Sequence, residues 1–174
     1  MSTANQTLTG ERADLAETLA KHRHFLRFSA RELTNEQAAS QTTVSELCIG
    51  GLIKHVTAVE RMWARFIVEG PSAMGTWDDD AAMQAHFDGF KMLPGEALSG
   101  LLEDYAAAAE QTDELLATLP ELDAAQPLPE APWYEPGASW SVRRVLLHII
   151  AETSQHAGHA DIIREAIDGA KTMG

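Results

Sequence analysis

The sequence is poor in cysteine, in positive charge and in long apolar runs. Its one cysteine, Cys48, cannot form a disulfide within the chain, which indicates a reducing compartment. Thirteen Lys and Arg against 26 Asp and Glu give a net charge of −13, so no basic face is available for nucleic acid or an anionic membrane surface. No apolar run approaches the ~18 residues of a spanning helix, and the N-terminus lacks the apolar core of a signal peptide. We expect a cytoplasmic protein.

Residues that favour β-strands are also scarce, since Ala, Leu, Glu and Gln dominate the composition. We expect the 174 residues to form one nearly all-α domain (1–174), with 1–9 loosely ordered. Apolar residues at helical spacing predict four long helices, over about 10–33, 45–68, 96–119 and 142–169. Long connections separate the second helix from the third and the third from the fourth, and the pattern predicts a four-helix bundle.

Several residues mark the expected helix ends and faces. Ser45 and Ser141 are the predicted N-caps of the second and fourth helices. The pair Gly50–Gly51 indicates either the close approach of another helix or a helix that begins after it. The charged residues of the first helix are expected mostly away from its apolar side: Glu11, Arg23, Arg27 and Arg31.

The two long connections differ in character. The connection 70–94 is predicted to contain a short helix from the acidic residues 78–80 to about Phe87. Within it His86 has no neighbour at ligand spacing, which indicates a surface residue. The connection 119–140 contains five prolines and should be extended and stiff. A loop of this length is usually functional or disordered, and we expect its aromatic residues to wall a substrate pocket: Trp133, Tyr134 and Trp140.

Polar residues interrupt the apolar stripe of the fourth predicted helix, whose residues 146–165 read LLHIIAETSQHAGHADIIRE. Glu152, His156 and His159 lie in or beside that stripe. An unpaired polar group in a core costs on the order of 2–7 kcal/mol, so these three need compensation. His55 lies on the buried stripe of the second helix.

Two explanations are open for these residues. In one, His55, Glu152 and His156 bind a metal ion through two nitrogens and one oxygen, leaving an open position as in catalytic zinc sites. Zn fits best, although Fe(II), Ni(II) or Mn(II) also accept this donor set. In the other, the same residues form a hydrogen-bonded polar network.

Two more histidines border this set on the fourth helix. His148 lies one turn before Glu152, but ligands on three successive turns span ~12 Å, so His148, Glu152 and His156 cannot share one ion. His159 is either an alternative ligand or an acid/base residue one turn beyond His156.

The segments LIKHVTAVERMW around His55 and ETSQHAGHADIIRE in the fourth helix resemble the DinB/YfiT-like superfamily of bacterial metal-binding bundles. The actinobacterial branch that includes mycothiol S-transferases is the most similar, over roughly Glu11 to Gly169. The resemblance implies His55 as one ligand, Glu152 as the second and His156, followed by Ala157–Gly158, as the third. Glu152 stands where the superfamily commonly has His, and mycothiol-dependent maleylpyruvate isomerases are similar in using a carboxylate there.

The resemblance implies a metal-dependent thiol S-transferase, in which a metal-bound thiolate, from mycothiol as co-substrate, attacks an electrophile. His159 is then expected to carry protons as the catalytic acid/base. Alternatives are a thiol-dependent isomerase or metal hydrolase on the same site, and a non-catalytic bundle that binds a ligand or dimerises. A homodimer is plausible for a bundle of this size.

Overall fold

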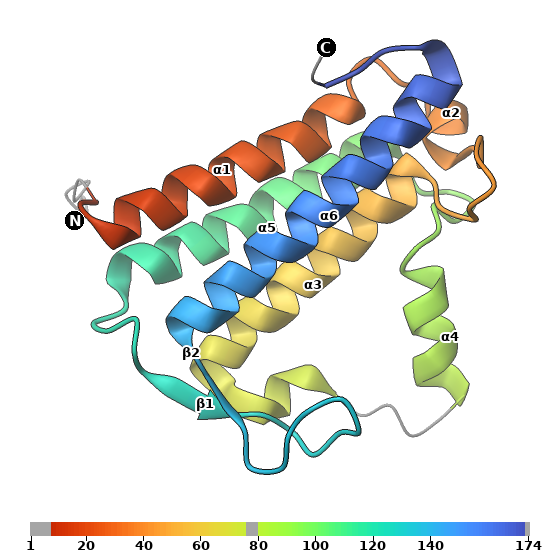
Figure 1. The fold of residues 1–174 in the computed structure, drawn as a ribbon. Coiled ribbons are helices and arrows are strands. Elements are labelled where there is room, and N and C mark those ends of the chain that lie inside the picture. Colours follow the sequence, from red (N-terminus) through yellow and green to blue (C-terminus); the bar gives the residue numbers. More distant parts are fainter. Residues whose placement is uncertain (1–7, 76–79, 173–174) are drawn as a thin grey trace.

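The computed structural model describes residues 8–75 and 80–172, and residues 1–7, 76–79 and 173–174 lie outside the described ranges. Four long helices lie side by side within those ranges (Figure 1): α1 (Glu11–Ser29), α3 (Ile49–Glu69), α5 (Leu98–Thr118) and α6 (Val142–Asp168). α6 packs against α1 and α3, and α5 packs against α3 and α1. The prediction of a nearly all-α fold is confirmed. Among the described residues, no helix combines the length and the apolar character needed to cross a membrane.

Shorter elements fill the connections between the long helices. They are α2 (Asn35–Ala39), the 3₁₀ helix η1 (Gly70–Met74), α4 (Asp80–Asp88), β1 (Ala125–Pro127) and β2 (Ser139–Ser141). The predicted short helix of the second connection is confirmed as α4, although its expected first two residues, 78 and 79, lie outside the described ranges. The strands β1 and β2 pair antiparallel, with Gln126 opposite Trp140, so the proline-rich connection is closed into a hairpin that the sequence did not predict.

The ends of α6 agree with the sequence, whereas the start of α3 does not. The Ser141 hydroxyl accepts a hydrogen bond from the Arg144 backbone, and Gly169 ends α6 in the left-handed conformation. The prediction of Ser45 as a cap is wrong. The N-cap of α3 is Cys48, whose Sγ accepts from the Gly51 backbone, while Ser45 Oγ accepts from Leu47 in a turn before the helix.

The expected outward position of Arg23 is also wrong. Its side chain is 2% exposed and donates to both carboxylate oxygens of Glu60, which is fully buried on α3. A second contact, from Arg23 Nη1 to Asp113 Oδ1 on α5, measures 2.8 Å. The pairing is possible because α1 places a guanidinium opposite a carboxylate on α3, and one helix's sequence pattern does not report that facing residue.

The glycine pair in α3 lies inside the helix, which begins before it at Ile49. A Cβ on Gly51 would lie 1.9 Å from the carbonyl oxygen of Phe90, so only glycine allows this approach. The glycines thus serve a close approach, as one interpretation expected, but the approaching chain is the segment after α4 and not another helix. This contact matters for the site because it brings the side chain of Phe90 next to the ring of His55.

Candidate metal centre

The residues predicted as metal ligands come together where α3 and α6 pack against each other. His55 extends from α3, and Glu152 and His156 extend from successive turns of α6. Their side chains are 13%, 28% and 12% exposed, respectively, so the cluster is largely withdrawn from solvent.

The three side chains direct one donor atom each towards a common point. His156 Nε2 lies 3.5 Å from Glu152 Oε2, and His55 Nε2 lies 4.0 Å from the same oxygen. The two imidazole rings are 4.8 Å apart and nearly perpendicular. All three donor atoms lie within 4.8 Å of one another. The structure thus assembles a two-nitrogen, one-oxygen set from two helices.

The electrostatics of the cluster keep its donors available. Burial, with a smaller contribution from His156, lowers the pKa of His55 from 6.5 to about 4, and Glu152 acts in the opposite direction. A hydrogen bond with His156 lowers the pKa of Glu152 below its usual value, against the effect of burial. At neutral pH the cluster therefore offers a neutral His55 and an ionised Glu152, the protonation states that metal binding requires.

The observed spacing fits a small divalent cation. Bonds of 2.0–2.2 Å in a tetrahedral site hold ligand atoms roughly 3.3–3.6 Å apart. The 3.5 Å and 4.0 Å separations from Glu152 lie at or just above that range, and all three donor atoms lie within 4.8 Å of one another, so a bound ion would draw the two imidazoles closer together. Three protein ligands leave one position for water or substrate, which is the arrangement of catalytic rather than structural zinc sites.

His148 contacts the other oxygen of Glu152. Its Nε2 lies 3.8 Å from Glu152 Oε1, whereas Oε2 faces His55 and His156. The His148 ring lies edge-on to Trp63 at 4.9 Å and to Trp140 at 5.1 Å, so two indoles fix its orientation. The 3.8 Å separation is longer than a hydrogen bond, so His148 lies beside the carboxylate without a direct bond to it. Its place on the Oε1 side agrees with the prediction that it cannot share one ion with Glu152 and His156.

His159 lies behind His156. The two Nδ1 atoms are 3.4 Å apart, a hydrogen-bonding distance in which one imidazole donates and the other accepts. When His156 offers Nε2 as a ligand, its Nδ1 carries the proton and donates to His159. The geometry gives His159 a role in fixing the tautomer of His156, and its predicted role as an acid or base towards substrate stays a prediction.

Two ring side chains, Phe90 and His86, lie over the cluster on the α4 side. The sequence did not connect either of them with the cluster. The Phe90 ring stacks on His55 at 3.8 Å with an interplanar angle of 21°. His86, exposed as predicted, nonetheless has its ring 6.5 Å from His55 and 5.4 Å from Phe90. The signal that could have found this contact is Gly51, whose missing side chain admits the backbone of Phe90.

The aromatic residues expected to wall a pocket occupy different positions. Trp140 stacks on Trp63 at 4.7 Å and contacts His148, so it reaches the metal cluster through one intervening residue. Tyr134 lies 6.0 Å from Trp140, and Trp133 lies 6.1 Å from Tyr134 and is 61% exposed. The structure brings Trp140 close to the cluster and leaves Trp133 at the surface.

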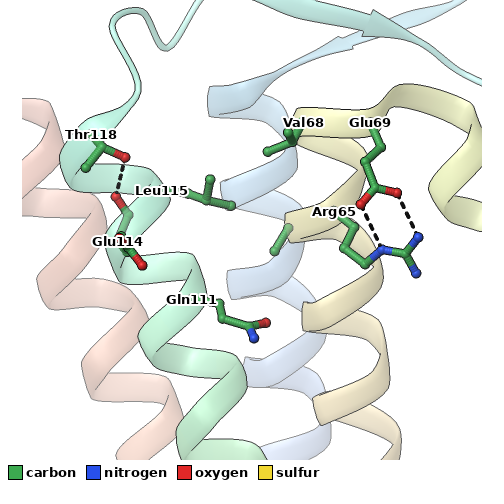
Figure 2. A pocket seen from close by; sticks show the side chains of 8 residues that line it. Arg65, Val68, Glu69, Gln111, Glu114, Leu115 and Thr118 are labelled. Atoms are coloured by element: carbon green, nitrogen blue, oxygen red, sulfur yellow. Dashed lines mark hydrogen bonds and ion pairs between the residues drawn. The ribbon is translucent and has the colours of Figure 1, made fainter.

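Figure 2 shows a groove of about 350 Å³ between α3 and α5, away from the metal cluster. An ion pair between two exposed residues of α3 lies at its edge, with Arg65 Nη2 2.7 Å from Glu69 Oε2. Arg65 is ten residues beyond His55, which corresponds to about 15 Å along the helix. The lining includes no His or Cys, so it offers no imidazole or thiol for chemistry: Ala64, Arg65, Val68, Glu69, Gln111, Glu114, Leu115 and Thr118.

Comparisons with known proteins give a family and a fold. The family model described as mycothiol-S-transferase matches residues 14–169, which include all three donor residues. A solved structure described as a conserved protein from Enterococcus faecalis is similar with a TM-score of 0.65 and 14% identity, over 94% of this chain and all of that one. At this identity the likeness shows the fold alone. The search of curated proteins returns no significant match.

Proposed function

Because the chain belongs to the mycothiol S-transferase family, we propose that it is a metal-dependent enzyme that transfers a low-molecular-weight thiol to an electrophilic carbon. Mycothiol is the first candidate for the thiol. The observation that carries the proposal is the convergence of His55 Nε2, His156 Nε2 and Glu152 Oε2. Two imidazole nitrogens and one carboxylate oxygen from facing helices are a donor set that zinc and related divalent cations accept.

The proposed arrangement assigns a task to each residue near the cluster. His55, Glu152 and His156 bind the divalent cation, with Zn favoured and Ni, Fe or Mn as alternatives. A cation at this place supplies Lewis acidity that lowers the pKa of an incoming thiol. His148 and His159 hold Glu152 and His156 in orientation, and Phe90 shields the His55 ring from water.

The proposed reaction is a displacement at carbon. The thiol releases its proton to solvent, and the sulfur lone pair forms a bond to the electrophilic carbon. The leaving group departs with the electron pair of the bond that breaks, so no oxidant or reductant is needed. The chain contributes by holding the sulfur and the carbon in line, which converts a bimolecular encounter into a local one.

The fold supports the proposal by holding ligands from two helices in fixed register. We infer that residues 1–174 form one domain and that α1, α3, α5 and α6 act as a four-helix bundle, whose inward side chains build the site. Ligands on facing helices are positioned by the packing of those helices, which loops cannot do equally well.

The test uses purified protein, stripped of metal and then reloaded with zinc. We expect zinc-dependent conjugation of monobromobimane or 1-chloro-2,4-dinitrobenzene by mycothiol, and loss of the reaction with chelator or with His156→Ala. The transferase proposal is wrong if the loaded protein consumes neither electrophile with mycothiol, glutathione or bacillithiol. Recovery of a rearranged substrate without a thioether product would instead identify a thiol-dependent isomerase.

A further inference from the structure

A cavity of about 440 Å³ adjoins the metal cluster on the α4 side of α3. Among the described residues that line it, the titratable ones are two imidazoles and the others are small or apolar: His55, Ala58, Val59, Met62, Met74, Ala82, Ala85, His86 and Gly89. The volume lies within the range of small-molecule sites. His55 therefore takes part in two sites: its Nε2 faces the proposed metal position, and its ring also lines an apolar cavity.

The lining is built from one stripe of α3 and from the segment that crosses in front of it. His55, Ala58, Val59 and Met62 follow helical spacing and share a face. Met74 comes from η1, and the remaining lining residues come from α4 and the glycine after it. The cavity thus lies between two elements that the chain places opposite each other.

The helix α4 gains little from packing against the rest of the protein. It has nine residues, and none of them is buried. Figure 1 shows α4 set apart from the four long helices. An isolated helix of this length is marginal in water, whereas Ala82 and Ala85 of α4 line the cavity. An apolar molecule in the cavity would cover that face of α4 and the stripe on α3 together.

We propose that this cavity binds the electrophile: a small, uncharged and largely apolar molecule whose reactive carbon lies at the His55 end. This inference rests on the proposed thiol transfer. Apolar walls favour a ring or alkyl body and disfavour charged substrates, because burying an unpaired charge there has a large cost. Among the described lining residues, the two imidazoles, with ring centroids 6.5 Å apart, are the polar side chains that a leaving group or activating substituent would meet.

The same geometry separates the two substrates. The electrophile enters beside His55 from the α4 side, and the sulfur forms its bond to carbon at the position left open by His55, Glu152 and His156. The carbon–halogen bond, for a chloroarene, breaks with its electron pair on chloride. The Glu152 side of the cluster is occupied by His148, Trp63 and Trp140, which closes that approach to a second apolar body.

The test measures binding without reaction. 2,4-Dinitrotoluene has the size of 1-chloro-2,4-dinitrobenzene but carries no leaving group, so its affinity for the zinc-loaded protein is measured by calorimetry. Ala58→Trp fills the cavity from an exposed position of α3 and should weaken binding about tenfold or more. Ala107→Trp, at an exposed position of α5 away from the cavity, is the matched control and should leave affinity unchanged.

A second variant, Ala85→Trp, fills the cavity from α4. If Ala58→Trp disturbs the folding of α3, Ala85→Trp still tests the cavity. Both filling variants should keep the full zinc content and the circular dichroism of the wild type, which shows that the fold and the metal centre are intact. Wild-type protein that binds no dinitrotoluene, or equal affinity in the filling and control variants, would overturn the proposal. If the cavity binds as expected but no thiol is conjugated, the binding site stands and the transferase proposal fails.

Discussion

Two groups of polar side chains face inward on neighbouring helices, and they differ in how their charges are balanced. Arg23 and Glu60 form a buried ion pair with direct hydrogen bonds, and their side chains are 2% and 0% exposed. His55, Glu152 and His156 instead bring one carboxylate and two imidazoles to a common point. The first group contains its own counter-charge, whereas the second combines one carboxylate with two imidazoles, of which His55 is neutral at neutral pH. This difference separates a structural contact from a ligand set.

The distance between the groups makes the comparison informative. Glu60 follows His55 by five residues on α3, which is about 7.5 Å along the helix axis. Both groups therefore include a residue of the same helix, and the ion pair is the more deeply buried of the two. Substitutions in each should produce opposite signatures: loss of folding stability at the ion pair and loss of metal at the cluster.

The largest effect is expected at the ion pair. Glu60→Ala leaves Arg23 buried with only the half-exposed Asp113 as a partner, and should lower the free energy of unfolding by about 3–5 kcal/mol. Urea denaturation of the metal-free protein measures this loss. The double variant Arg23→Met/Glu60→Leu, which removes both charges, should recover most of it. A single-variant loss below about 1 kcal/mol would show that the pair is not a structural contact.

At the metal cluster, the free energy of unfolding should depend more on bound zinc than on the substitution itself. At a free zinc concentration of 100 times its dissociation constant, binding to the folded state should stabilise the wild type by about 2.7 kcal/mol. In metal-free protein His156→Ala should cost only about 0.5–1.5 kcal/mol, the value of one hydrogen bond, and zinc should add nothing. Paired denaturation curves with zinc and with chelator measure both quantities. Equal zinc-dependent stabilisation of variant and wild type would contradict the account.

His148 should have an intermediate effect through Glu152. His148→Ala removes the ring beside the carboxylate oxygen Oε1 and should weaken zinc binding about 10–100-fold, as for other residues that orient a metal ligand. Competition with a chromogenic chelator measures the affinity. His148→Gln keeps a hydrogen-bond donor and should restore part of the loss, whereas Leu147→Ala, an exposed neighbour on α6, should change nothing. No difference between the Ala and Gln variants would remove the orienting role.

The smallest effect is expected at the start of α6. Ser141→Ala removes the N-cap hydrogen bond and should cost about 1 kcal/mol of folding stability. The stabilisation by zinc should stay the same, because Glu152 lies three turns further along the helix. Ser139→Ala, in β2 and away from the cap, is the control. A cap variant with weakened zinc binding would show that the cluster depends on the helix end.

The sequence predicted the parts of this molecule that depend on one helix at a time. The stripe of His55 on α3, the i, i+4 spacing of Glu152 and His156 and the cap at Ser141 all follow from local periodicity and local hydrogen bonds. The resemblance to the DinB/YfiT-like superfamily and its mycothiol S-transferase branch is confirmed by the family match. Each of these features follows from residues that are close together in the sequence.

The features that the sequence missed depend on which element faces which. Arg23 looks like a surface residue until α3 places Glu60 opposite it. Phe90 and His86 reach His55 only because Gly51 admits the chain after α4. Such pairs are set by tertiary packing, and a helical periodicity contains no information on the facing segment.

The most direct test of the account is the zinc content of the purified protein after removal of metal, reloading and desalting. We predict one zinc per chain for the wild type, and none above background for His55→Ala and His156→Ala, whose circular dichroism should stay that of the wild type. Equal zinc in all three proteins, or none in the wild type, would contradict the assignment of His55, Glu152 and His156 as a metal centre.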